Sequence, residues 1–323
     1  MNTRISALAA ALLIALAAPA MSADVPQGTI KGKAWVQTDR TMAEAMAQSW
    51  TVLPASVTGD KTYEGTNIRA PETKGKAPAV IFVHGSGGIN PQIKAFQKRL
   101  ADELGIASFT ADSFQLPDRM TYTSPIDPMD YEKIHALRAS ELTAAVEFLA
   151  KQPWFNGRFV IAGTSEGAVA VARYVRAEAA PAEAGRIIFS WSCENNYHVV
   201  QHKTRIPDGM PVLNIMSSKD KYFSQANPYL GNHEAVGNCS KALQGNPNAR
   251  IVLIKDAPHT LMNEPEAREA EDKFLKDVLL KSSTPGFHPI RHAHGPPQAS
   301  CLQRAFSSCG SLTFVRPRTN IAS

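Results

Sequence analysis

Residues 163–167 read Gly-Thr-Ser-Glu-Gly, and this short segment restricts the possible folds of the chain more than any other feature. An apolar run lies directly before it at residues 159–162, and an Ala/Val-rich run lies directly after it at residues 168–172. This order predicts a buried strand, a sharp turn and a helix. The glycines allow neighbouring segments to pass closely, and Ser165 is expected to project its hydroxyl above the edge of a sheet.

Apolar runs of strand length alternate with helix signals along most of the chain. The runs expected to be buried strands lie at residues 79–83, 106–110, 159–162, 186–191, 211–216 and 250–255. Two earlier strands are expected at residues 50–57 and 61–69, and the longest helices at residues 91–104, 131–151 and 264–281. The alternation predicts an α/β fold with a mostly parallel central sheet and helices on both faces.

A serine on such a turn needs partners before it can act as a nucleophile. Its hydroxyl is weakly nucleophilic at neutral pH, so a base must take the proton and an anion must orient that base. Backbone N–H groups must also stabilise the developing oxyanion. On sheets of this kind the three side chains follow one another in the order Ser, acid, His, so the acid and the base are expected after Ser165.

Asp220 is the acid expected to serve this role. It follows the strand predicted at residues 211–216 through a three-residue loop, and side chains at the carboxyl ends of parallel strands face the ligand crevice. Asp208 precedes the same strand and so lies at its wrong end, and Glu194 is the other rival. A capping or solvated loop acid is the structural alternative for Asp220.

His259 is the expected base because it lies between the last predicted strand and the last predicted helix. Four other histidines precede Asp220 in the chain: His84, His135, His198 and His202. His233 follows Asp220, but no predicted strand leads to it. Asp256 is a rival acid partner for His259, although orientation of its own loop is the favoured role.

Residues 84–88 read His-Gly-Ser-Gly-Gly and follow the strand predicted at residues 79–83. We expect this loop to supply one oxyanion donor, the N–H of Ser86, and the turn to supply the other, the N–H of Glu166. A plain glycine-rich turn is the alternative, and a phosphate-binding loop is disfavoured because no Gly-Lys-Ser/Thr follows. The polar segment at residues 112–130 is expected to help form a pocket wall.

The side chain of Glu166 is an unusual neighbour for such a serine, and two explanations are open. It faces a basic or polar group near the pocket, or it simply occupies the first helical turn, where the helix dipole favours an acid. The second explanation is the favoured one.

The two ends of the chain differ in composition from its middle. Residues 1–23 combine Arg4, an uncharged Ala/Leu-rich run and small residues near position 23, which predicts a cleaved export signal. The run is short for a membrane-spanning helix, which needs about 20 apolar residues, and no other segment qualifies. Residues 282–323 hold five prolines and no acid, which predicts a disordered tail. Residues 24–281 are therefore the expected folded domain.

The formal net charge of +5 comes from the two ends. Residues 1–23 contain one arginine and residues 282–323 contain four, and neither segment contains an acid. Removing these five arginines from the 34 basic residues leaves 29, which equals the 29 acidic residues. The remaining segment has no basic excess for binding nucleic acid.

Two of the four cysteines, Cys193 and Cys239, lie in the expected domain, and Cys301 and Cys309 lie in the expected tail. An exported protein reaches the periplasm or the medium, where disulfides persist. Of the three possible connectivities Cys193–Cys239 is favoured, and two separate buried thiols are the alternative. Neither cysteine pair has metal-site spacing with histidines, so zinc is not expected.

The chain resembles the dienelactone hydrolase-like branch of the α/β-hydrolases over about residues 50–281. The resemblance is carried by the helix at residues 139–149, Trp154, and the strand and turn at residues 158–168. The glycine loop at residues 84–88 also looks like that of the family. Its acid and histidine match Asp220 and His259, but dienelactone hydrolases proper use cysteine as nucleophile. Ser165 therefore points to a broader esterase.

The resemblance implies an α/β-hydrolase fold and hydrolysis of an ester or lactone by an acyl-enzyme route without metal or organic cofactor. Ser165 would attack the carbonyl, His259 would move the proton and Asp220 would hold His259. A peptidase or an acyltransferase with the same three residues is an alternative, and so is a non-catalytic binding protein on this scaffold. The sequence leaves the oligomeric state open.

Overall fold

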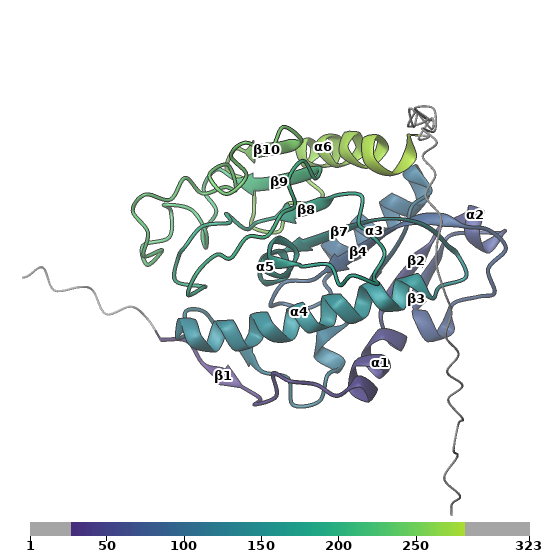
Figure 1. The fold of residues 1–323 in the computed structure, drawn as a ribbon, viewed down its shortest axis with the longest axis horizontal. Coiled ribbons are helices and arrows are strands. Elements are labelled where there is room, and N and C mark those ends of the chain that lie inside the picture. Colours follow the sequence, from purple (N-terminus) through teal and green to yellow (C-terminus); the bar gives the residue numbers. More distant parts are fainter. Residues whose placement is uncertain (1–26, 282–323) are drawn as a thin grey trace, which may run out of the picture. The chain divides into compact units, whose positions relative to one another are not determined.

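A computed structural model of the protein describes residues 27–281. The predicted export signal at residues 1–23 and the predicted tail at residues 282–323 both lie outside the described residues. Between them, strands and helices alternate along the chain, as Figure 1 shows by its colours. No helix within residues 27–281 is long and apolar enough to cross a membrane.

The centre of the fold is a sheet of eight strands. In spatial order these are β10 (Ala249–Ile254), β9 (Val212–Ser217), β8 (Arg186–Phe189), β7 (Phe155–Thr164), β4 (Ala77–Val83), β5 (Ala107–Thr110), β2 (Trp50–Leu53) and β3 (Tyr63–Thr66). All pairs from β10 to β5 are parallel, whereas β2 is antiparallel to both β5 and β3. The mostly parallel sheet predicted from the sequence is therefore confirmed.

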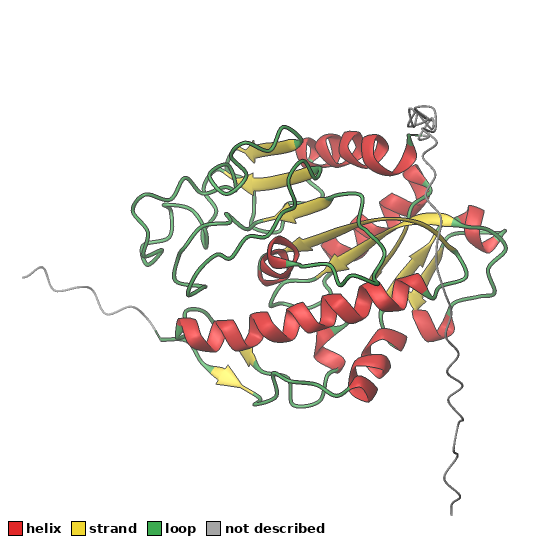
Figure 2. Ribbon diagram, in the orientation of Figure 1, coloured by secondary structure: helices red, strands yellow, loops and turns green. Residues whose placement is uncertain are grey.

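Helices cover both faces of this sheet (Figure 2). The longer helices are α1 (Asp39–Ala47), α3 (Pro91–Leu104), α4 (Pro128–Ala150), α5 (Glu166–Arg173) and α6 (Pro265–Leu275). Successive residues of β4 point to opposite faces: Ile81 packs with residues of α1, α4 and α5, and Phe82 with residues of α3 and α6. Burial on both faces explains why the strand sequences are continuously apolar.

Shorter elements complete the described segment. They are α2 (Ala55–Thr58), η1 (Asn67–Arg69), η2 (Ser113–Gln115), the π-helical turn η3 (Lys276–Leu280), and the strands β1 (Ile30–Lys31) and β6 (Thr121–Tyr122). β1 and β6 pair with each other in an antiparallel two-stranded sheet. The polar excursion at residues 112–130 therefore contains a short strand that the sequence pattern did not predict.

The strand predicted at residues 50–57 is too long. β2 ends at Leu53, and Pro54 and the single turn α2 follow it. Proline has no N–H for a sheet ladder, so the strand stops where Pro54 begins. Gly59 then ends α2 in the left-handed region with φ of 78°.

The carboxyl ends of the parallel strands meet at one edge of the sheet. Val83 at the end of β4 is paired with Gly163 near the end of β7. Ser217 at the end of β9 is paired with Ile254 at the end of β10. The loops after these strands, which carry the residues singled out by the sequence, therefore lie at the same edge.

Candidate active site

Ser165 occupies a strained turn between β7 and α5. Its φ and ψ are 56° and −122°, a combination that few residues other than glycine adopt. The Ser165 N–H donates to the carbonyl oxygen of Phe189 at 3.0 Å, so the turn is tied to the end of β8. The predicted sequence of strand, sharp turn and helix is confirmed, and it is the strand-to-helix turn typical of the α/β-hydrolase fold.

The glycines on both sides of this turn are required by close contact. A Cβ added at Gly167 would lie 2.1 Å from the carbonyl oxygen of Val83, the last residue of β4. A Cβ added at Gly163 would lie 2.7 Å from the carbonyl oxygen of Gly167. Side chains at these positions would push the turn away from the neighbouring strand.

Asp220 and His259 meet at the same edge of the sheet. The Nδ1–H of His259 donates to Oδ2 of Asp220 at 2.6 Å, and the Asp220 side chain is fully buried. The other carboxylate oxygen accepts the backbone N–H groups of Tyr222 and Phe223, both at 2.9 Å. A carboxylate that accepts at Nδ1 selects the tautomer in which Nε2 is free to accept a proton.

The rival acids have other partners. Asp256 forms an exposed ion pair with Lys219 at 3.0 Å. Glu194 accepts the N–H groups of Val236 and Gly237 at 2.8 and 3.0 Å and so shapes a loop. These contacts leave Asp220 as the acid that holds His259.

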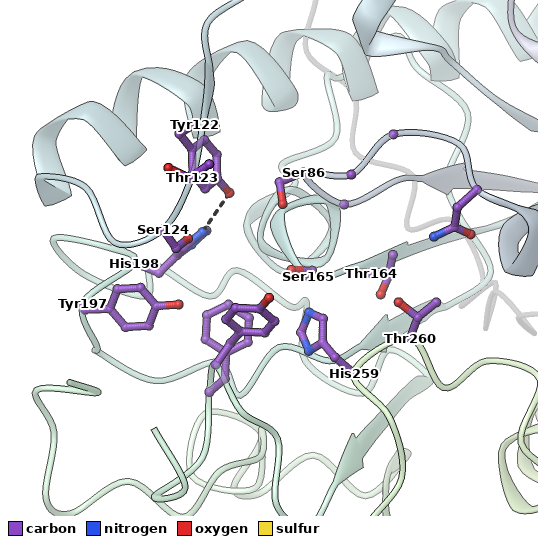
Figure 3. A pocket seen from close by; sticks show the side chains of 16 residues that line it. Ser86, Tyr122, Thr123, Ser124, Thr164, Ser165, Tyr197, His198, His259 and Thr260 are labelled. Carbon is purple, nitrogen blue, oxygen red and sulfur yellow. Dashed lines mark hydrogen bonds between the residues drawn. The ribbon is translucent and has the colours of Figure 1, made fainter. Parts of the chain in front are cut away.

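Ser165 and His259 line one cavity of about 460 Å³. Figure 3 shows the His259 ring beside Ser165. Nε2 of His259 is buried and has no hydrogen-bond partner among the described residues, so Ser165 Oγ and this nitrogen are not yet hydrogen-bonded. Such loose geometry is common in catalytic pairs before a substrate binds.

One predicted oxyanion donor lines the same cavity, and the other directly follows Ser165 in the chain. Ser86 lines it directly, and Glu166 is the first residue of α5, where a backbone N–H has no intrahelical acceptor. Within residues 27–281, neither N–H donates a hydrogen bond to another backbone or side-chain group. Both amides are therefore available to a ligand.

His84 anchors the glycine loop and does not face the cavity as a base. Its Nδ1–H donates to the carbonyl oxygen of Gly85 at 2.6 Å, and its Nε2 accepts the N–H of Ser113 at 3.1 Å. Burial, and then the nearby Arg138, hold the pKa of His84 well below its usual value. The neutral ring thus fixes the loop that carries Ser86.

The side chain of Glu166 is fully buried and paired with arginine. Its Oε1 lies 2.7 Å from Nη2 of Arg119 and 3.5 Å from Nε of Arg138. The less favoured explanation of this residue is therefore the correct one: a basic group faces it. No sequence pattern signals this pairing, because Arg119 lies 47 residues earlier in an irregular segment.

Both arginines reach further groups around the turn. Arg119 Nε donates to Ser113 Oγ at 2.7 Å, while Arg138 donates to Glu141 at 2.7 Å and to the carbonyl oxygen of His84 at 2.8 Å. We call Glu166, Arg119, Arg138 and Glu141 the charge cluster. It connects the turn at Ser165, the glycine loop at residues 84–88 and the excursion at residues 112–130.

Aromatic side chains form the wall opposite the turn. They are Tyr122, Tyr197, His198, Tyr222 and Phe223. The Tyr222 ring packs on the His259 ring with centroids 4.5 Å apart. Sequence reasoning anticipated a wall from the excursion at residues 112–130 but missed the other four residues, because their loops have no periodic pattern.

A disulfide joins the two loops that supply most of this wall. Cys193, after β8, is bonded to Cys239, after β9, with an S–S distance of 1.98 Å. This is the pairing favoured from the sequence. The loop after Cys193 carries Tyr197 and His198, so the bond holds that loop close to the one that follows β9.

The described residues contain no group of three or more His, Cys, Asp and Glu side chains placed to hold a metal ion.

No protein-family model matches the chain, and no curated protein sequence matches it. Solved structures do. Est1E from Butyrivibrio proteoclasticus is 17% identical with a TM-score of 0.43, covering 71% of this chain and 93% of its own. XC6422 from Xanthomonas campestris, an α/β serine hydrolase without lid, is 15% identical with a TM-score of 0.42, covering 72% and 90%.

A third similar structure is a dienelactone hydrolase-like promiscuous phosphotriesterase from metagenomic libraries. It is 16% identical, has a TM-score of 0.43, and the match covers 64% of this chain and 88% of that one. The solved structures to which this chain is similar thus include an α/β serine hydrolase and a dienelactone hydrolase-like enzyme.

Proposed function

We propose that the protein is a serine hydrolase that cleaves a carboxylic ester or lactone through an acyl-enzyme. The observation that carries the proposal is the hydrogen bond between His259 and Asp220 in a cavity that also holds Ser165 on a strained turn. A strained backbone conformation at an exposed reactive group is typical of a functional site.

In the first half of the reaction, Ser165 Oγ attacks the carbonyl carbon and its proton passes to Nε2 of His259. The carbonyl oxygen becomes an oxyanion that accepts the N–H groups of Ser86 and Glu166. The tetrahedral intermediate then collapses, the bond to the alcohol oxygen breaks, and His259 returns the proton to that oxygen.

In the second half, a water molecule attacks the acyl-enzyme. His259 takes one proton from the water, the bond to Ser165 Oγ breaks, and the proton returns to Ser165 as the acid leaves. Asp220 stays ionised throughout and stabilises the imidazolium form of His259. The buried position of Asp220 and its two backbone donors suit this constant role.

We further propose that the protein is exported to the periplasm or secreted. The composition of residues 1–23 supports this, and so does the disulfide, which persists in an oxidising compartment. In the same proposal, residues 24–281 form the hydrolase domain and residues 282–323 a tail that activity does not need.

A panel of p-nitrophenyl esters of increasing chain length, with lactones and peptide amides beside them, tests the proposed activity. Wild type should hydrolyse esters or lactones, and Ser165→Ala should lower kcat by about 10⁴-fold or more. Preference for amides would indicate a peptidase, and transfer to an added alcohol without hydrolysis an acyltransferase. Folded protein inactive on the whole panel would support a binding protein.

A further inference from the structure

The cavity at Ser165 contains no side chain with a formal charge. None of the 16 residues that line it is Asp, Glu, Lys or Arg. A carboxylate or ammonium group on a ligand would therefore lose its hydration here without gaining an ion pair, which is costly. The cavity is built for an uncharged molecule.

One end of this cavity is nevertheless polar. Figure 3 shows Tyr122, Ser124, Tyr197 and His198 together on one side of Ser165, with Thr164 and Thr260 on the other side. The Tyr122 hydroxyl and His198 Nε2 are hydrogen-bonded at 3.1 Å. We call Tyr122, Ser124, Tyr197 and His198 the polar end.

His198 adds no positive charge to the polar end. Its side chain is buried, and this burial, followed by the neighbouring His135, holds the pKa of His198 well below its usual value. The ring is therefore a neutral hydrogen-bonding group, which matches the uncharged lining of the rest of the cavity.

Two polar atoms at this end, the Tyr197 hydroxyl and His198 Nδ1, are buried and form no hydrogen bond of normal geometry among the described residues. The Tyr197 side chain faces no closer partner than Ser124, which lies near enough to interact weakly with its hydroxyl. The ring cannot easily turn away, because it stacks on Phe223 and meets Tyr131 and Tyr229 edge-on, with centroids 5.9 to 6.3 Å apart. Figure 3 shows the hydroxyl directed toward the middle of the cavity.

A buried hydroxyl without a partner costs free energy that a bound group can recover. Ser124 and Tyr122 lie nearby with hydroxyls of their own, and Ser124 Oγ already accepts the Tyr131 hydroxyl at 2.9 Å. Phe223 also lines the cavity, and its ring centroid lies 6.3 Å from that of Tyr197, 5.4 Å from that of His198 and 6.0 Å from that of His259. These surroundings suit a flat apolar group that ends in a hydroxyl or carbonyl oxygen.

We propose that the polar end is a recognition site for an uncharged hydrogen-bonding group on the substrate, and that Tyr197 determines this specificity. The substrate class is then an uncharged ester whose acid or alcohol part carries a hydroxyl or carbonyl group, best on an aromatic ring. This inference rests on the proposed ester hydrolase function and names its substrate.

Two matched pairs of esters test the proposal. On the acid side, methyl 3-(4-hydroxyphenyl)propanoate is compared with methyl 3-phenylpropanoate. On the alcohol side, 2-(4-hydroxyphenyl)ethyl acetate is compared with 2-phenylethyl acetate. In at least one pair, wild type should prefer the hydroxylated ester by about tenfold in kcat/KM.

Tyr197→Phe removes only the hydroxyl and should bring that preference close to onefold, mainly through KM. Tyr229→Phe is the matched control: it removes a hydroxyl from a ring that packs on Tyr197 but does not line the cavity, so the preference should remain. Retention of the preference in Tyr197→Phe would overturn the assignment.

A binding measurement separates this proposal from the proposed function. Ser165→Ala should bind the hydroxylated member of the preferred pair more tightly than its partner in calorimetry, without turnover. If both members bind equally well and an active wild type hydrolyses them equally well, the proposed recognition role of the polar end is wrong, while the proposed ester hydrolase function stands. Tighter binding of the hydroxylated ester with no hydrolysis of any ester by wild type would contradict the proposed function alone.

Discussion

The two sides of the turn at Ser165 are built from opposite kinds of residue. On one side lies the cavity, lined by hydroxyls, aromatic rings, glycines and two histidines, with no Asp, Glu, Lys or Arg side chain. Behind lies the charge cluster of Glu166, Arg119, Arg138 and Glu141, in which each residue is no more than 6% exposed. Two arginines and two glutamates are thus buried next to the turn that carries Ser165, although the cavity at Ser165 has no such side chain in its lining.

This contrast assigns different tasks to the two sides. The charge cluster holds three segments in register, because its arginines bond the nucleophile turn, the glycine loop and the excursion at residues 112–130. The cavity meets the substrate. Changes behind the turn should therefore affect stability and the rate on every substrate, whereas changes in the wall should affect the choice of substrate.

The largest expected effect belongs to the cavity side. His259→Ala should lower kcat by about 10⁴-fold, because the base that takes the serine proton is removed. Its side chain packs at the cavity rim, so the loss of stability should be smaller than for the charge cluster. Steady-state kinetics and thermal unfolding measure the two quantities. Activity comparable to wild type would contradict the assignment of the base.

Glu166→Gln tests the other side of the contrast. It leaves two buried arginines with one fewer negative partner, so the free energy of unfolding should fall by about 3 kcal/mol. The turn at Ser165 and the glycine loop should also shift relative to each other. As a result, kcat should fall about tenfold or more on all esters alike. Denaturant unfolding and kinetics on several esters measure this.

Glu183→Gln is the matched control for that variant. Glu183 pairs with the buried Arg186 at 2.7 Å, and neither residue lines the cavity. The control should lose stability but keep kcat. If both variants lose stability and neither loses kcat, the charge cluster is structural only and does not position the oxyanion donors.

Replacing both Cys193 and Cys239 by serine examines the wall of the cavity. The free energy of unfolding should fall by about 3 kcal/mol, because a closed loop of 46 residues in the unfolded chain is released. The loops bearing the aromatic wall should loosen, so KM should rise more than kcat falls. An unchanged KM in the folded double variant would show that the wall does not depend on the disulfide.

The last effect, which should not appear at neutral pH, concerns the buried His135, whose ring lies 5.0 Å from that of His198. Burial lowers the pKa of His135 from its usual 6.5 to about 4, so below pH 6.5 the unfolded chain takes up a proton that the folded one refuses. Stability is therefore lost as the pH falls, at about 1.4 kcal/mol per pH unit for this group. In His135→Gln, the free energy of unfolding should therefore fall less steeply between pH 6.5 and 4, by about 1.4 kcal/mol per pH unit.

Urea unfolding at several pH values gives the slope of the free energy of unfolding against pH for wild type and for His135→Gln. His233→Gln, at an exposed loop position, is the control and should leave the slope as in wild type. Identical slopes for wild type and His135→Gln would show that another group takes up the proton.

The central sheet, the nucleophile turn and the meeting of Asp220 with His259 could all be predicted from the sequence. Each depends on local patterns: an apolar run marks a buried strand, and the residue that follows lies at a known edge of the sheet. The sequence also favours the Cys193–Cys239 disulfide, since these two cysteines lie in the expected domain and the other two in the expected tail.

The partners of Glu166 and the members of the aromatic wall could not be predicted. Arg119 and Tyr197 lie in irregular segments, where neither the period of a helix nor that of a strand tells which way a side chain points. Their contacts form only when distant loops converge over the sheet. The predicted strand at residues 50–57 also ends early: Pro54 cannot donate to a sheet ladder, and α2 follows it.

A fluorophosphonate probe followed by peptide mapping tests most directly the claim that Ser165 is a nucleophile activated by His259 and Asp220. The folded wild type should carry one adduct on Ser165, and labelling should slow by orders of magnitude in His259→Ala and Asp220→Asn. A folded wild type that stays unlabelled, or an adduct on another serine, would contradict the claim.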